Sequence, residues 1–116
     1  MRLVLLSAII LLAGCSGSEV PPTPLTAEQS AALSPKDARL ASLYAGSCKS
    51  CHTVTAAQAP LTGDRTQWDP RWTKGADALL TSALQGKGKM PAGGQCFECS
   101  PADLTKLIAF MAGREP

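Results

Sequence analysis

The chain has little histidine and little excess charge. His52 is the only histidine among 116 residues, which excludes any site that needs two imidazoles. Eleven Lys and Arg stand against nine Asp and Glu, and this near balance gives no basic surface for nucleic acid. The apolar run at 3–12 is too short to span a bilayer, which takes about 20 residues. The length suits one small domain.

Residues 1–15 have the pattern of an export signal. Arg2 gives a positive start, residues 3–12 are almost wholly apolar, and the segment ends in Leu12-Ala13-Gly14-Cys15. This resembles a bacterial lipoprotein signal, which implies cleavage before Cys15 and a lipid on its sulfur. An ordinary secretory peptide is the alternative. We favour lipidation because Cys15 would otherwise be an unpaired thiol in an oxidising compartment.

Residues 16–33 are predicted to be a proline-rich linker, and residues 34–116 the folded domain. Pro21, Pro22 and Pro24 interrupt any helical period. Such chain extends by about 3.1 Å per residue, so the stretch would hold the domain about 50 Å off a membrane. A tail with no spacing role is the alternative.

The motif Cys48-x-x-Cys51-His52 is the attachment signature of a c-type haem. On a helical turn these positions share one face, so both thiols can bond the vinyl groups of one porphyrin while His52 reaches the iron. With Cys96-x-x-Cys99, the four thiols offer a zinc site or dithiol chemistry as alternatives. The His after Cys51 and the export signal favour one covalent haem c.

Met90 is predicted to be the sixth ligand of the iron. It lies in the segment 86–91, where two glycines allow the main chain to approach a flat ligand and a proline follows the Met. Thioether is a soft donor that stabilises Fe(II), whereas Met111 has helical core spacing. Without Met90 on the iron, the site would be open to peroxide or a gas, as in a peroxidase or a gas sensor.

Three further residues are candidates for the surroundings of the haem. The carbonyl of Pro60 is expected to accept a hydrogen bond from the far ring nitrogen of His52, although a turn proline explains it equally well. Trp68 or Arg71 is expected to bind a haem propionate, through an indole N–H or a guanidinium fork. Plain core packing is the alternative for the indoles.

Cys96 and Cys99 are predicted to form a disulfide. The compartment is oxidising, and the other two thiols of the domain are assigned to haem. A catalytic dithiol remains the alternative, because Cys99 stands just before a helix N-terminus, where thiol pKa values are lowered.

Apolar periodicity and capping residues predict an all-α domain. Four helices are expected: from Pro35 with Ser34 as its cap, a short one from Pro70 with Asp69 as its cap, Ala76 to Gln85, and Pro101 to about Ala112 with Ser100 as its cap. Residues 53–69 are predicted to be loop. The last helix should pack across the first, with Tyr44 against Phe110.

These motifs together resemble the class I c-type cytochromes, closest to cytochrome c5. The resemblance rests on Cys48-x-x-Cys51-His52, Pro60-Leu61, Trp68-x-x-Arg71, Gly86-x-Gly88-x-Met90-Pro91, Gly94-x-Cys96-x-x-Cys99-Ser100 and the helix 103–111. It implies a small all-α fold around one haem, His/Met ligation, a Cys96–Cys99 disulfide and periplasmic electron transfer. The lipoprotein signal departs from the soluble members of the family.

The expected function is electron transfer and not catalysis. With His52 on iron, no histidine is left for a nucleophile and base pair. We expect a monomeric carrier, lipid-anchored on the periplasmic side of a bacterial inner or outer membrane. Its partners would be a quinol-oxidising complex and a terminal oxidase or reductase. Lys49, Lys87 and Lys89 either guide an acidic partner or form a solvated surface.

Overall fold

The computed structural model describes residues 20–114, and the elements in that range are all helices, with no strand. The predicted all-α fold is therefore confirmed. The signal peptide, Cys15 and the first residues of the predicted linker lie outside the described residues. Between 20 and 114, no helix has the length and apolar character needed to cross a membrane. The elements are α1 (Ala27–Ala31), α2 (Ala38–Gly46), α3 (Lys49–His52), η1 (Thr55–Ala57), α4 (Arg65–Trp72), α5 (Ala76–Gln85), η2 (Ala92–Gln95) and α6 (Pro101–Met111).

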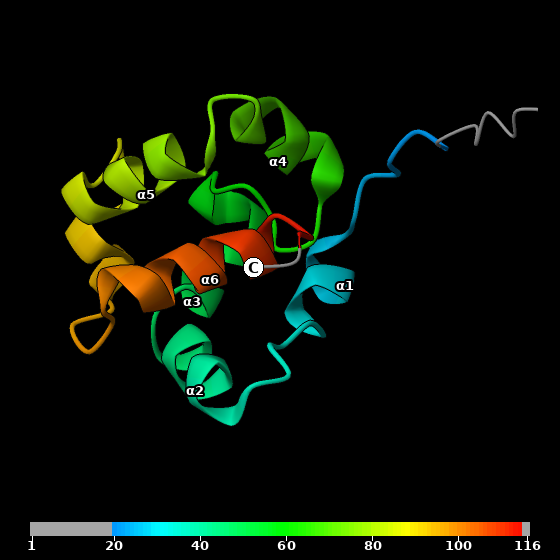
Figure 1. Cartoon of the computed structure of the whole chain (residues 1–116). Helices are drawn as coiled ribbons and strands as arrows, with labels where there is room; N and C mark the ends of the chain where they lie inside the picture. The colour runs from blue at the N-terminus through cyan, green and yellow to red at the C-terminus, as the bar shows by residue number, and fades with distance from the viewer. Residues whose placement is uncertain (1–19, 115–116) are drawn as a thin grey trace, which may run out of the picture.

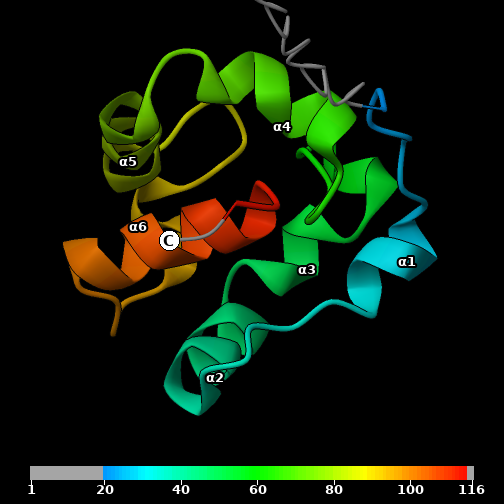
Figure 2. The same ribbon diagram turned by 45° about the vertical axis from the view of Figure 1, so that its right-hand side comes forward.

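Helix α6 runs through the middle of the domain, with α5 on one side and α2 on the other (Figures 1 and 2). Its buried face is apolar and meets Leu43 and Tyr44 of α2 in one core. The rings of Tyr44 and Phe110 meet edge to face, with centroids 5.1 Å apart. The predicted packing of the last helix on the first is confirmed.

The two later helices have the predicted bounds. Helix α5 ends at Gln85, and Gly86 follows with a positive φ of 82° that favours glycine. Helix α6 begins after Ser100, whose side chain accepts from the Asp103 N–H while the Asp103 carboxylate accepts from Ser100. This reciprocal cap satisfies two N–H groups that the first turn leaves free.

The predicted start of the first domain helix is wrong by one turn. The cap of α2 is Asp37, whose carboxylate accepts from the Leu40 N–H at 2.8 Å. Ser34 and Pro35 lie before the helix. A carboxylate makes a charge-assisted bond at the positive end of the helix, and this outweighs the neutral hydroxyl of Ser34.

The predicted start of the next helix, at Asp69 and Pro70, is also wrong. Helix α4 begins at Arg65, with Asp64 as its cap, so that Pro70 lies inside it. The Asp64 carboxylate is fully buried and accepts from the N–H and hydroxyl of Thr66, at 3.0 and 2.6 Å. Asp69 instead binds Arg65, which its place within the helix permits.

Part of the predicted linker is folded. Helix α1 lies within the range 16–33, and Thr26 and Gln29 form a capping box at its start. The pattern Thr-x-x-Gln signals such a start, but three prolines just before it conceal the signal. The linker prediction is therefore wrong for residues 26–33.

Candidate cofactor site

The two thiols of the Cys-x-x-Cys-His motif lie on one helical turn and are both free. Helix α3 follows Cys48, and the N–H of His52 donates to the Cys48 carbonyl at 3.0 Å. Cys48 is buried and Cys51 is exposed. Cys96 and Cys99 have the same spacing yet form a disulfide. The first pair is thus available for another covalent partner.

His52 is buried, and its ring is held in one tautomer. Nδ1 lies 2.8 Å from the carbonyl oxygen of Pro60, as predicted. Since a carbonyl only accepts, Nδ1 carries the proton and Nε2 presents a lone pair. Burial lowers the pKa of His52, the bond to Pro60 opposes this, and the charge of Arg71 adds to it. The ring is therefore the neutral imidazole that a metal requires.

Trp68 packs against this imidazole. The two rings stack with centroids 5.8 Å apart and planes 27° from parallel. The indole N–H donates to the Leu61 carbonyl at 2.8 Å. The only donor of Trp68 therefore already has a buried partner, which favours Arg71 over Trp68 for the predicted propionate contact. Arg71 is exposed and bonds the Gln67 carbonyl through one nitrogen, so its other N–H groups remain for that role.

The segment 60–64 holds His52 at both the ring and the main chain. Besides the Pro60 contact, the N–H of Thr62 donates to the His52 carbonyl at 2.7 Å. The hydroxyl of Thr62 accepts from the Tyr44 hydroxyl at 2.9 Å. Sequence patterns gave no reason to select Thr62, and they suggested only packing for Tyr44. Burial raises the pKa of Tyr44, which keeps it neutral as the donor.

Met90 is held by a tight turn and by two glycines. The N–H and carbonyl of Met90 pair with those of Lys87, at 3.0 and 2.9 Å. A Cβ on Gly86 would lie 2.9 Å from the Met90 carbonyl oxygen, and one on Gly94 would lie 3.3 Å from its Cε. Lys89 reaches Gln58 of the segment after the Cys-His turn, at 2.7 Å. The turn therefore sets the position of the Met90 main chain, and the two glycines leave room for it and for the end of its side chain.

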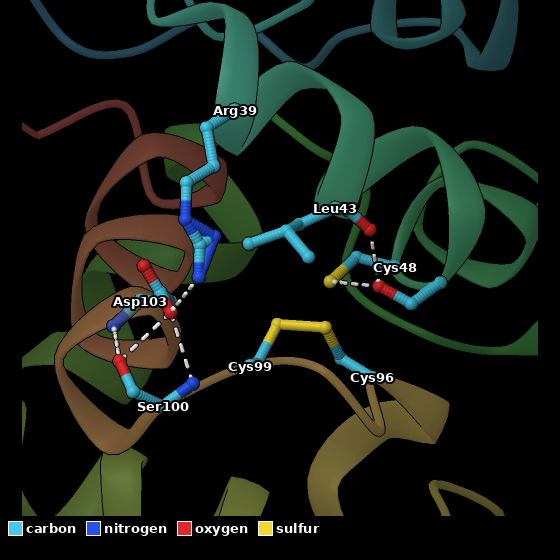
Figure 3. The surroundings of a disulfide bond; sticks show 8 residues. Arg39, Leu43, Cys48, Cys96, Cys99, Ser100 and Asp103 are labelled. Carbon is cyan, nitrogen blue, oxygen red and sulfur yellow. Dashed lines mark hydrogen bonds and ion pairs between the residues drawn. A yellow bond between two sulfur atoms is a disulfide. The ribbon is translucent and has the colours of Figure 1, made fainter.

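The disulfide lies beside the Cys-His turn. Leu43 and Cys48 point toward it (Figure 3), and Cys96 and Cys99 pack against the cluster that contains both. Across residues 20–114, no three His, Cys, Asp or Glu side chains gather into a possible metal site. The Cys96–Cys99 disulfide contradicts the four-thiol zinc alternative, because it occupies two of the four thiols.

The residues present fit one covalently bound haem. Two free thiols and an imidazole with a fixed lone pair share a turn. Cys48, Trp68 and Met90 belong to one apolar cluster, which suits a macrocycle. The thioether of Met90, which Gly94 allows close to its main chain, would give such a group a second, soft iron donor.

Comparison with known proteins agrees with this geometry. The family model described as cytochrome C oxidase, cbb3-type, subunit III, matches residues 35–111. Cytochrome c5 of Azotobacter vinelandii is 37% identical over 68 residues, which cover 57% of this chain and 82% of the relative. Cytochrome c-555 of Chlorobaculum tepidum is 33% identical over 75 residues, covering 61% and 69%.

A solved structure extends the likeness to the fold. It is the crystal structure of the electron transfer complex of nitrite reductase with cytochrome c, of which one chain is 40% identical, with a TM-score of 0.59. The match covers 67% of this chain and 98% of that one. The chain belongs to the cytochrome c family, as a class I monohaem cytochrome near cytochrome c5 that carries one covalent haem c.

Proposed function

We propose that the protein is a membrane-anchored, periplasmic one-electron carrier. Cys48 and Cys51 form thioethers to the haem, while His52 and Met90 bind the iron. The observation that carries this proposal is the turn on which both thiols are free and the imidazole is fixed by Pro60. The cytochromes c among its relatives support a carrier and not an enzyme.

The chain's own residues suit a carrier. When bound, haem supplies a one-electron couple. Pro60 fixes the proton on Nδ1 of His52, and Trp68 packs beside the ring. With both His52 and Met90 binding it, the iron would have no open position for a substrate. A peroxidase or gas sensor would need that position open, and the glycine-held turn at Met90 argues against it.

The anchor follows from the sequence pattern at Cys15, and the fold shortens the proposed tether. With α1 folded, the linker from Cys15 to Pro24 is only about ten residues and reaches about 30 Å. The domain would therefore stay closer to the membrane than a tether running to Leu33 allows. Fatty-acid labelling should mark the wild-type protein and not the Cys15→Ala variant. Equal labelling of the two would contradict the anchor.

Redox proteins are the proposed partners. A related chain is found in a complex of nitrite reductase with cytochrome c, which supports docking to a terminal reductase or oxidase. A quinol-oxidising complex would supply the electron. Lys87 is exposed, and Lys49 is half-buried. Such charges suit the small, weak interface of rapid electron exchange.

Optical spectra of Met90→Leu test this function, with Met111→Leu as the matched control. The oxidised wild-type protein should be low-spin, with a Met-to-iron charge-transfer band. Met90→Leu should lose that band, and its reduction potential should fall. Met111→Leu changes a buried core residue and should keep both. A high-spin wild-type spectrum, or a band that survives in Met90→Leu, would contradict the carrier.

A further inference from the structure

Helix α1 lies before the range 35–111 that the family model matches, yet it packs on the Cys-His turn. The hydroxyl of Ser30, which is fully buried, donates to the carbonyl oxygen of His52 at 3.1 Å. The same carbonyl accepts from the N–H of Thr62. Ser30 is therefore a buried hydrogen-bond donor to the main chain of His52, and not merely a residue that covers the surface of the domain.

Two further contacts join α1 to the segment that holds the His52 ring. A Cβ on Gly63 would lie 2.5 Å from Cδ1 of Leu33 and 3.4 Å from Cδ2 of Leu25, so both side chains cover this glycine. Gly63 itself donates its N–H to Met111 at the end of α6, at 2.7 Å. The flanks of α1 therefore close over a segment that α6 holds from the other side.

The residues around α1 also contact Asp64, the cap of α4. Burial raises the pKa of Asp64, and bonds from Thr66 and from the main-chain N–H of Leu25 outweigh that effect and hold it below its usual value. The stretch 25–33 thus contacts His52, Gly63 and Asp64. These lie around Pro60, whose carbonyl fixes the ring. Figures 1 and 2 both show α1 against this part of the domain.

We propose that α1 is a brace that positions His52, with Ser30 as the positioning residue. This inference rests on the proposed role of His52 as an iron ligand. Ser30 acts through the main chain of His52, and Leu33 acts through the segment 60–64. Together they keep Nδ1–H aligned on the Pro60 carbonyl. That hydrogen bond makes the imidazole a stronger electron donor to the iron, which favours the oxidised state. If the brace is loosened, the hydrogen bond weakens and the reduction potential rises.

The test uses Ser30→Ala and Leu33→Ala in the full-length holoprotein, with Glu28→Ala as control. Alanine is a good helix former, so Ser30→Ala removes the hydroxyl without weakening α1 itself. Glu28 lies on the exposed face of the same helix. The readouts are the exchange rate of the His52 Nδ1 proton in the reduced protein, measured by NMR, and the reduction potential.

Ser30→Ala should speed that exchange about five-fold, the factor that one buried hydrogen bond is worth, and shift the potential upward. Leu33→Ala should act in the same direction, and Glu28→Ala should change neither. Lower melting temperatures with both readouts unchanged would overturn the brace and leave α1 a structural cover. A wild-type protein without His/Met spectra would contradict the proposed function, while the proton exchange would still decide on α1.

Discussion

The hydroxyl of Tyr44 donates to the hydroxyl of Thr62 at 2.9 Å, and neither side chain is exposed. This bond ties α2 to the segment whose main chain holds His52. A tyrosine selected for packing alone would have no such partner. The core and the candidate haem site therefore share one hydrogen-bond network, so a substitution in one should also affect the other.

Loss of this bond should be measurable as a coupling. Tyr44→Phe and Thr62→Val should each lower the free energy of unfolding by about 1–2 kcal/mol. Each substitution removes one hydroxyl and leaves the other, which is buried, without this partner. The double variant should lose less than the sum, by about 1 kcal/mol. Denaturant unfolding of the four proteins checks this cycle. Strict additivity would show that the two hydroxyls do not interact.

Asp64 should make the stability depend on pH in the acid range. Its carboxylate has a pKa below the ordinary 3.8 in the folded protein. Its contribution is therefore fully present above about pH 4 and is lost as the pH falls through the folded value. Asp64→Asn should cost about 1–3 kcal/mol at pH 7, with a smaller difference from wild type at pH 3.

The matched control for this carboxylate is Asp77→Asn, on the exposed first turn of α5. It should stay within about 0.5 kcal/mol of wild type. Thermal unfolding by circular dichroism at pH 3 and pH 7 makes the comparison. A gap between Asp64→Asn and wild type that stays constant with pH would contradict the role given to the charge.

Substitutions of Arg71 and Trp68 should differ in their effect on the pH dependence of the reduction potential. Arg71→Ala should change the pH dependence of the reduction potential, because a propionate that loses its guanidinium titrates at a higher pH. Trp68→Phe should leave that dependence unchanged, since its N–H binds the Leu61 carbonyl. It should instead lower stability by about 1–3 kcal/mol. Potentiometry between pH 5 and 9 decides, and an unchanged Arg71→Ala profile would remove Arg71 from the site.

The disulfide should stabilise the fold without being needed for haem. The loop between Cys96 and Cys99 is short, and the chain-entropy relation gives about 2 kcal/mol for it. The double variant Cys96→Ser/Cys99→Ser should lose about that much stability and keep its full haem content. Unfolding curves and the haem-to-protein ratio are the measurements. Loss of haem from this variant would show that the second pair takes part in attachment.

Features encoded by local spacing were predictable. The turn that carries Cys48, Cys51 and His52 follows from helical periodicity, and α5 and α6 follow from apolar spacing with a glycine or a capping box at their ends. The disulfide could be expected from the compartment. Each of these depends on residues a few positions apart, where sequence patterns are informative.

Features that depend on competition between residues, or on contacts far apart in the sequence, could not be predicted. Ser34 and Asp37 both resemble caps, and only the folded chain shows that the carboxylate is used. The indole of Trp68 has one donor, and its choice of the Leu61 carbonyl depends on the position of a loop. The helix α1 is stabilised by contacts of Ser30 with His52, 22 residues further on.

The proposed function requires one haem bonded to the chain through Cys48 and Cys51. The intact mass of the purified protein after extraction with acidified acetone shows whether this bond exists. We predict the mass of the processed chain plus one haem, and a chain without haem for Cys48→Ala/Cys51→Ala. A wild-type mass without haem, or pigment that passes into the acetone, would contradict the account.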